Sequence, residues 1–159
     1  MTINIGIDDS NRKAVADLLN KLLADEFVLY VKTRNFHWNA ETPNFSELHK
    51  FFEGQYEALD ETIDEVAERA RALGGKAVAT LGEYAKLTRL PETAVNTQSQ
   101  TAMLSALLAD HEALIRTLRA GAAACDEEYG DAGTADFLVG LMAQHEKTAW
   151  TLRAHLKGA

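Results

Sequence analysis

The sequence predicts an all-α protein of one domain, a four-helix bundle with one long connection between its second and third long helices. Four long segments repeat apolar residues with the 3.6-residue period of an α-helix, and no segment alternates in the manner of a strand. The chain has 159 residues, of which 47% are hydrophobic, and it contains only two prolines. A chain of this length and composition can bury a core between helices.

The predicted long helices follow one another in two pairs. The first spans about residues 10–35, with Ser10 at its N-cap, and the second spans about residues 44–74, between Pro43 and a pair of glycines that ends it. A short helix over about residues 77–87 precedes Pro91 and a polar loop. The third and fourth long helices span about residues 99–128 and 132–156, and the sequence YGDAG separates them.

A single long crossover between two such pairs is typical of a ferritin-like bundle, whereas a simple up-and-down bundle has only short loops. The crossover here carries the one short helix. In this interpretation the whole chain, residues 1–159, is one ferritin-like domain, and residues 1–9 are a short N-terminal extension.

Charge and cysteine content restrict the class of protein. The formal net charge is −8 and the basic residues are scattered, which disfavours nonspecific binding to nucleic acid and favours cationic partners. The one cysteine, Cys125, cannot form an internal disulfide and is interpreted as a structural thiol. The start of the sequence has no signal-peptide pattern and no apolar run reaches membrane-spanning length, so we expect a cytoplasmic protein.

A stripe of metal-binding residue types lies beside the core face of the second helix. At about 100° of rotation per residue, His49, Glu53, Asp64 and Glu68 share this stripe. Each histidine or carboxylate is four residues from a partner, so the four form two pairs. The pairs lie about 16–22 Å apart along the helix, too far to share an ion, because metal–ligand bonds are about 2 Å long. The neighbouring core face holds Phe45, Leu48, Phe52, Tyr56, Leu59, Ile63, Val66, Ala70 and Leu73.

Each pair is therefore half of a metal site within one chain. His49 and Glu68 are equally distant in sequence from the point between residues 58 and 59, and so are Glu53 and Asp64. Antiparallel pairing of two copies about a two-fold axis at that point completes two identical sites, and His37 can add a nitrogen to each. Imidazoles and carboxylates without thiolate suit iron, manganese or zinc. The alternative interpretation is a solvated acidic face with histidines that bind nothing.

Three polar residues lie on the apolar faces of different helices: Glu26, His111 and His145. Because buried polar groups need partners, we interpret them as a mutually hydrogen-bonded cluster, and a secondary metal site is the alternative. The residues three positions before the two histidines are Leu108 and Met142. The Glu-x-x-His pattern of di-iron sites inside a single bundle is therefore absent.

Several segments resemble a known family. NFHWN, NFSELHKFFEGQYEALDETIDEVAERARALGG, DHEALIRTLR and EKTAW are similar to the Dps proteins, the mini-ferritins named for DNA protection in starved cells. The resemblance covers nearly the whole chain. It implies a homo-oligomer of two-fold dimers, a hollow dodecamer, that binds Fe(II), oxidises it to Fe(III), preferably with hydrogen peroxide, and stores ferric mineral.

The resemblance also implies a set of iron ligands. The ferroxidase site of the family lies at the two-fold interface. By position, one subunit gives His37, His49 and Glu53, and its neighbour gives Asp64 and Glu68. Relatives often have Asp at the position of Glu53, so this ligand departs from the family pattern.

Three further roles follow from the resemblance. Trp38 matches the family tryptophan that relays or traps an electron, and an interface aromatic is the alternative. The acidic lining of pores at the three-fold axis, near the start of the last helix, corresponds to Asp126, Asp131 and Asp136. Nucleation of mineral on the inner wall corresponds to Glu57 and Glu61.

DNA compaction is the rival function. Many Dps relatives bind DNA through a Lys-rich terminal tail, whereas this chain begins MTINIGIDDSNRK and ends TLRAHLKGA. The acidic total and these weakly basic ends predict weak or no DNA binding near neutral pH.

Overall fold

The computed structural model describes residues 3–92 and 99–157. Within these ranges it contains five helices and no strand: α1 (Asp9–Asn39), α2 (Phe45–Ala72), α3 (Leu81–Leu87), α4 (Gln100–Glu127) and α5 (Ala132–Lys157). The all-α class and the bundle with a helix-bearing crossover are confirmed. Residues 93–98 of the predicted polar loop lie outside the described ranges, as do residues 1–2 and 158–159.

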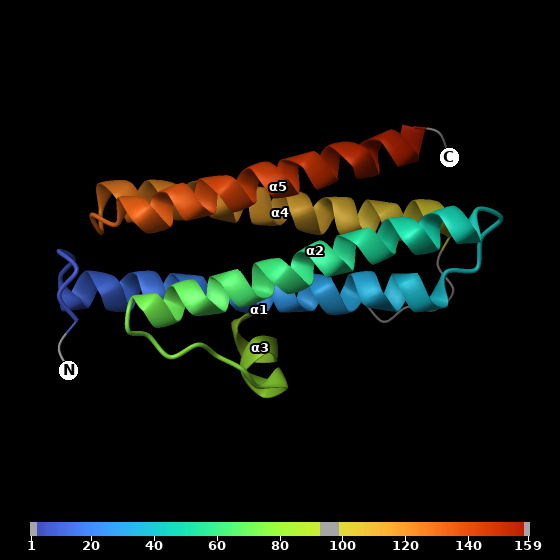
Figure 1. Ribbon diagram of the computed structural model, residues 1–159. Coiled ribbons are helices and arrows are strands. Elements are labelled where there is room, and N and C mark those ends of the chain that lie inside the picture. The colour runs from blue at the N-terminus through green and yellow to red at the C-terminus, as the bar shows by residue number, and fades with distance from the viewer. Residues whose placement is uncertain (1–2, 93–98, 158–159) are drawn as a thin grey trace.

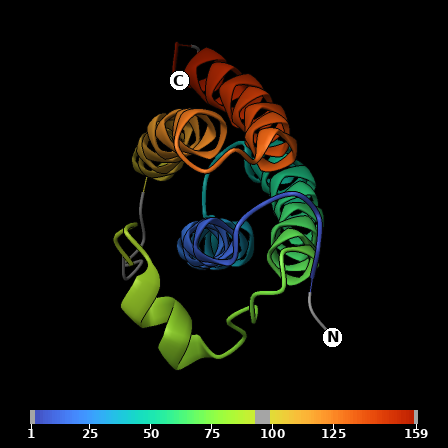
Figure 2. The ribbon, with the colours of Figure 1, turned by 90° about the vertical axis from the view of Figure 1, so that its left-hand side faces the viewer.

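The four long helices form two hairpins that lie side by side (Figures 1 and 2). α1 pairs with α2 and α4 pairs with α5, while α1 also contacts α4 and bears α3 on its outer side. The crossover with α3 returns the chain along the bundle before α4 begins, so α2 and α4 run in the same direction. This is the ferritin-like connection that the sequence predicts. In the part of the chain that the structure describes, no helix is long and apolar enough to span a membrane.

Side-chain caps mark where α3 and α4 begin, whereas α1 and α2 have none, and α1 begins at Asp9 so that Ser10 lies inside it and not at its N-cap. The Ser99 hydroxyl accepts a hydrogen bond from the backbone N–H of Ala102 at 3.2 Å, at the start of α4. Thr80 and Glu83 form a capping box at the start of α3. The short helix therefore begins at Leu81, later than the predicted residue 77, because Thr80 supplies the cap. α1 continues past the predicted end near residue 35 to Asn39, which places His37 in its last turn.

Two glycines end α2 as predicted. Gly74 has φ of 86°, in the left-handed region that favours glycine. A Cβ atom on Gly75 would lie 2.6 Å from the Cβ of Ala16 in α1. The pair therefore allows the crossover to leave α2 in close contact with α1.

The core lies between the two hairpins. Most of the predicted core face of α2 is buried, including Leu48, Phe52 and Val66. Phe45 is an exception at 43% exposure, because it is the first residue of α2, at the end of the bundle, and its ring lies against His49 instead. Cys125 is buried, and its burial together with the charge of Asp131 raises the pKa of the thiol to about 11, as a structural cysteine requires.

Two ion pairs with buried carboxylates hold α1 to the rest of the fold. Asp25 is 1% exposed and accepts hydrogen bonds of 2.6–2.8 Å from the backbone and guanidinium of Arg89, which fixes the end of α3 against α1. Lys32 of α1 and Asp110 of α4 form an ion pair of 2.5 Å, with both side chains at most 5% exposed. Burial raises the pKa of Asp110 above its ordinary value despite the neighbouring lysine.

Candidate metal centre

Two histidines from neighbouring helices stack where α1 ends and α2 begins. His37 lies in the last turn of α1, and His49 lies near the start of α2. Their ring centroids are 3.7 Å apart and their planes are within 18° of parallel. The ring of Phe45 lies against the His49 ring, with centroids 5.0 Å apart, so both imidazoles are held by their neighbours.

Reciprocal hydrogen bonds determine the tautomers of both rings. Nδ1 of His37 donates to the backbone carbonyl of His49 at 2.8 Å, and Nδ1 of His49 donates to the backbone carbonyl of His37 at 2.9 Å. A carbonyl oxygen only accepts hydrogen bonds, so each Nδ1 carries a proton and each neutral ring has its lone pair on Nε2. A backbone carbonyl on one ring nitrogen and a free lone pair on the other is the state in which histidine binds metals.

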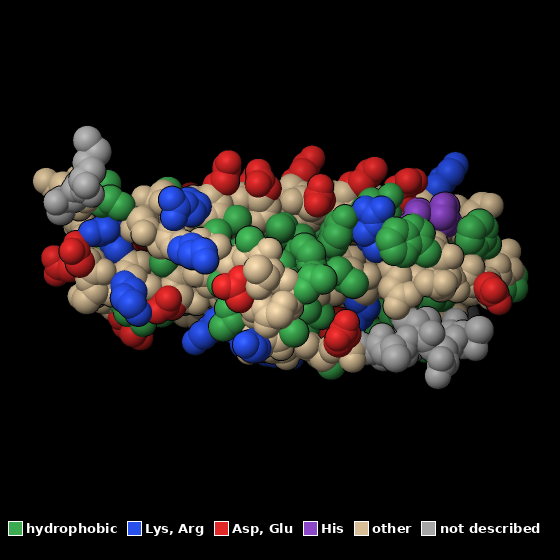
Figure 3. Space-filling model, turned by 90° about the horizontal axis from the view of Figure 1, so that it is seen from below, with side chains coloured by type: hydrophobic (Ala, Val, Ile, Leu, Met, Phe, Trp, Pro, Cys, Tyr) green, Lys and Arg blue, Asp and Glu red, His purple; other side chains and the backbone are tan. Residues whose placement is uncertain are grey.

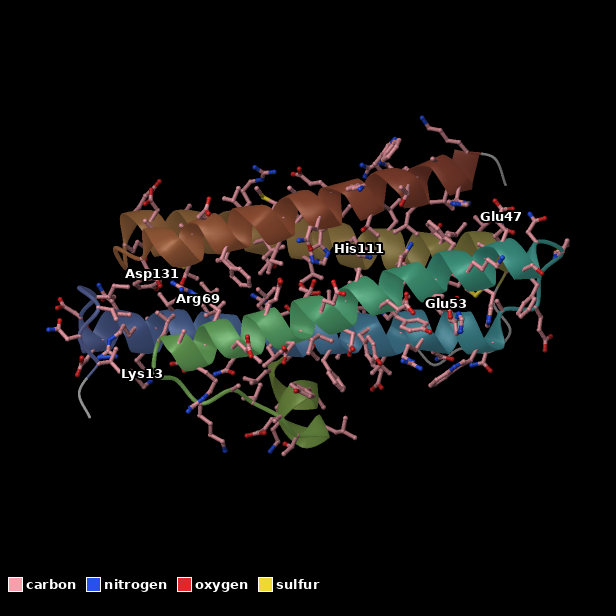
Figure 4. All side chains as sticks on the ribbon, in the orientation of Figure 1. Lys13, Glu47, Glu53, Arg69, His111 and Asp131 are labelled. Atoms are coloured by element: carbon pink, nitrogen blue, oxygen red, sulfur yellow. The ribbon has the colours of Figure 1, made fainter. Side chains whose placement is uncertain are left out.

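Tyr56 connects a carboxylate to this histidine pair. Glu53 follows His49 by one helical turn and is half-buried (Figure 4). The Tyr56 hydroxyl donates to Oε1 of Glu53 at 3.4 Å, and its ring meets the His37 ring edge-on with centroids 5.1 Å apart. Partial burial and the charge of Glu53 raise the pKa of Tyr56, which keeps it a protonated donor. The sequence identifies Tyr56 only as a core residue, although its place three residues after Glu53 is a signal of this contact.

Arg34 lies among three aromatic rings next to the same pair. Its guanidinium carbon is 4.4 Å from the ring centroid of Tyr56, 5.0 Å from that of Trp38 and 5.5 Å from that of Tyr30. Nη1 of Arg34 also donates to the Tyr30 hydroxyl at 2.8 Å. These cation–π contacts link the exposed Trp38 to Tyr56 and were missed from the sequence. The spacing of four residues between Arg34 and both Tyr30 and Trp38 is the available signal.

The other two predicted ligands lie further along α2. Asp64 and Glu68 are exposed and belong to the acidic residues of this helix, and Figure 3 shows a row of acidic side chains along one edge of the molecule. Within the described ranges, no three His, Cys, Asp or Glu side chains of the chain are placed to hold a metal ion together. The structure thus stacks His37 on His49, places Glu53 one helical turn after His49, and leaves Asp64 and Glu68 further along α2.

Asp131 is a buried cap at the start of α5, and its role in a pore stays a prediction. It is 2% exposed, and Oδ1 accepts hydrogen bonds from the Arg69 guanidinium at 3.0 Å and from the Thr134 backbone N–H at 2.9 Å (Figure 4). Its Oδ2 accepts from the Thr134 hydroxyl at 2.5 Å. The pore and mineral candidates that remain are all exposed, and their roles stay predictions: Asp126, Asp136, Glu57 and Glu61.

The buried cluster in the bundle core has the predicted hydrogen bonds. Nε2 of His145 lies 3.0 Å from Oε1 of Glu26, and Nδ1 of His145 lies 2.8 Å from Nδ1 of His111. All three residues are at most 4% exposed. Burial lowers the pKa of His145, but the charge and hydrogen bond of Glu26 outweigh it and leave that pKa raised. Burial and the neighbouring His145 hold the pKa of His111 well below its ordinary value.

Comparisons with known proteins agree with this architecture. Residues 16–159 match the family model of the ferritin-like domain. The chain is 46% identical to an uncharacterized low temperature-induced protein of Nostoc, over 98% of this chain and 87% of that protein. It is 40% identical to DNA protection during starvation protein 2 of Bacillus anthracis, over 91% of this chain and 97% of that protein. The crystal structure of a Dps protein from Vibrio cholerae, described as a member of a superfamily of ferritin-like diiron-carboxylate proteins, matches with a TM-score of 0.91 at 31% identity and covers 98% of both chains.

The buried cluster predicts a pH-dependent stability for the metal-free protein. Because the folded-state pKa of His145 is raised, its stabilising contribution is complete below the ordinary histidine value of 6.5 and is lost as the pH rises through the raised pKa. We expect Glu26→Gln to lower the free energy of unfolding by about 1–3 kcal/mol below that value. The difference from wild type should shrink as the pH rises above 6.5 and through the raised pKa of His145, measured by denaturant unfolding at each pH.

Glu112→Gln is the matched control for this measurement. Glu112 pairs with Arg153 at 2.9 Å on the surface, so we expect a loss below about 1 kcal/mol, with no dependence on pH in the same range. A difference between wild type and Glu26→Gln that stays constant with pH would contradict the assignment of the proton to the Glu26–His145 pair.

Proposed function

Because the chain belongs to the Dps family of ferritin-like proteins, we propose that it oxidises Fe(II) with hydrogen peroxide at sites shared between two copies and stores the ferric product in a hollow shell. One observation carries the proposal. The reciprocal hydrogen bonds of His37 and His49 leave an Nε2 lone pair on each of two stacked rings, and imidazole nitrogens with carboxylates are suited to iron.

A second copy of the chain supplies the missing ligands in this proposal. Antiparallel pairing of two α2 helices about the point between residues 58 and 59 brings Asp64 and Glu68 of one copy to His49 and Glu53 of the other. Exposed apolar side chains support an interface on this side of the chain (Figure 3). The exposed apolar side chains of α1 and α3 include Val31 at 44% exposure, Trp38 at 64% and Leu81 at 74%.

The proposed chemistry is a two-electron reduction of peroxide. Two Fe(II) ions each lose one electron, the O–O bond of hydrogen peroxide accepts the pair, and both oxygens end as hydroxide, water or ferric oxide. Delivering the two electrons together avoids the hydroxyl radical that a single electron would release. The carboxylates Glu53, Asp64 and Glu68 favour the more highly charged Fe(III) product.

Individual side chains adapt the site to this reaction. The hydrogen bond from Tyr56 orients Glu53, whose side chain is one methylene longer than the Asp that is common in the family. Trp38 lies next to His37, and we assign it the family role of an electron relay, with Arg34 between its ring and that of Tyr56. A dodecameric shell, iron entry past Asp126 and Asp136, and a cytoplasmic location complete the proposal.

The ferroxidase proposal predicts that His37→Ala/His49→Ala loses rapid iron oxidation. Anaerobic Fe(II) is added to the protein, hydrogen peroxide follows, and ferric absorbance and peroxide consumption are recorded. Wild type should consume about one peroxide per two irons, and the variant should react at least about 100-fold more slowly, since it lacks both imidazole ligands. His155→Ala, a half-buried histidine that lies against Phe51, should behave as wild type. Equal rates in wild type and the double variant would refute the assignment.

We further propose that protection proceeds without DNA contact. The relative from Bacillus anthracis is named for DNA protection, whereas this chain has a net charge of −8. Nonspecific DNA binding depends on contacts between basic side chains and DNA phosphates, and an acidic protein makes few of them. We expect no retardation of a DNA fragment in a gel near neutral pH. A retarded band that disappears as salt is raised would contradict this proposal.

A further inference from the structure

All four long helices bring polar side chains to one region of the bundle core. Glu26 comes from α1, Gln55 from α2, His111 from α4 and His145 from α5. Gln55, His111 and His145 line a cavity of about 90 Å³ between α2, α4 and α5. Figure 4 shows His111 pointing into the middle of the bundle, between the hairpins.

The hydrogen bonds determine which atom of His111 faces this cavity with a lone pair. The Glu26 carboxylate accepts, so at a pH above the raised pKa of His145 the neutral ring carries its proton on Nε2 and accepts at Nδ1. His111 must then donate from Nδ1, across the 2.8 Å that separates the two Nδ1 atoms. With both rings neutral, the one arrangement that makes both bonds leaves the lone pair of His111 on Nε2. Metal-binding histidines usually donate their other ring N–H to an acceptor that fixes the ring orientation. For His111 that acceptor is Nδ1 of His145, which is itself bonded to Glu26.

The atoms that face the cavity are also unpartnered. Among the described residues, Nε2 of His111 and both amide atoms of Gln55 are buried without a hydrogen-bond partner. Native proteins leave few buried polar atoms in this state, and each one calls for a ligand, a water or another explanation. His111 is 2% exposed, so bulk solvent does not provide a hydrogen-bond partner for its Nε2.

The cavity has room for a hydrated ion and an acidic approach. At about 30 Å³ per water molecule, 90 Å³ accommodates an ion with two waters. A neighbouring groove shares four residues with the cavity: Ala58, Thr62, Gln144 and Thr148. Two carboxylates, Glu61 and Glu65, and one cation, Lys147, line this groove, so the carboxylates outnumber the cation. The Glu26 carboxylate with two neutral imidazoles leaves a net negative charge in the core, which a cation would offset.

We propose that this cavity binds one divalent transition-metal ion per chain. Nε2 of His111 is the nitrogen ligand, the amide oxygen of Gln55 and water provide oxygen ligands, and Glu26 and His145 orient His111. Imidazole with neutral oxygen ligands suits zinc, cobalt or ferrous ions rather than copper(I). The site lies within one chain and does not depend on the proposed iron site between copies.

Cobalt(II) is the probe, because its visible absorption depends on its ligands. The parent protein is His37→Ala/His49→Ala, in which the proposed site between copies is disabled. Equilibrium dialysis of the assembled parent should find one cobalt per chain. Adding His111→Asn retains a polar atom near the Nδ1 position, for the bond to His145, and removes Nε2. We expect cobalt binding to weaken by at least about tenfold, because the nitrogen ligand is lost. His155→Asn, outside the cavity, should leave binding unchanged.

Two results would overturn the proposal: a parent protein that binds no cobalt, or a His111→Asn variant that binds it as tightly as the parent. If circular dichroism shows that the variant does not fold, crystals of the parent protein soaked in cobalt provide the test instead. An anomalous-scattering peak within bonding distance of Nε2 of His111 supports the site, and its absence refutes the site. Failure here leaves the iron oxidation of the wild-type protein untouched, so the two proposals are separable.

Discussion

Most polar side chains that the bundle buries have a hydrogen-bond or ion-pair partner inside it, and a few of these pairs organise the whole fold. Asp25 binds the backbone and side chain of Arg89 and so attaches the crossover to α1. Lys32 and Asp110 join α1 to α4, and Asp131 joins the start of α5 to Arg69 of α2. The hairpins are therefore positioned by specific polar contacts as well as by the apolar core, which alone would permit sliding.

The same constraint determines the geometry of the two histidines in the proposed half-site. At the α1–α2 turn, the polar hydrogens of two imidazoles are paired with each other's backbone carbonyls, which consumes both Nδ1 atoms. The site that remains is incomplete within one chain, because Asp64 and Glu68 lie further along α2. In the proposed mechanism, iron oxidation requires the dimer, because an isolated chain has imidazoles positioned for iron but too few carboxylates to hold it.

Helical periodicity was sufficient to predict the four long helices, the crossover and the buried Glu26–His145–His111 cluster, because each depends on spacing along a helix. Helical periodicity could not predict specific contacts between side chains of different helices. The reciprocal bonds of His37 and His49 depend on where one helix meets the backbone of the next, and the cation–π contacts of Arg34 depend on three rings that converge in space. The hydrogen bond between Asp131 and Arg69 was not predicted either, because Arg69 lies on a different helix, α2, and the contact depends on how the helices pack.

The most direct test of the central claim mixes two inactive proteins. His37→Ala/His49→Ala and Asp64→Ala/Glu68→Ala are each assembled alone and then co-assembled from equal amounts of unfolded chains, and iron oxidation by peroxide is measured. In a mixed dimer, one of the two sites receives all its ligands. Its histidines come from the Asp64→Ala/Glu68→Ala chain, and its Asp64 and Glu68 come from the His37→Ala/His49→Ala chain. Sites between copies predict that the mixture regains about a quarter of wild-type activity while each variant alone has almost none. A mixture as inactive as its components would contradict the account.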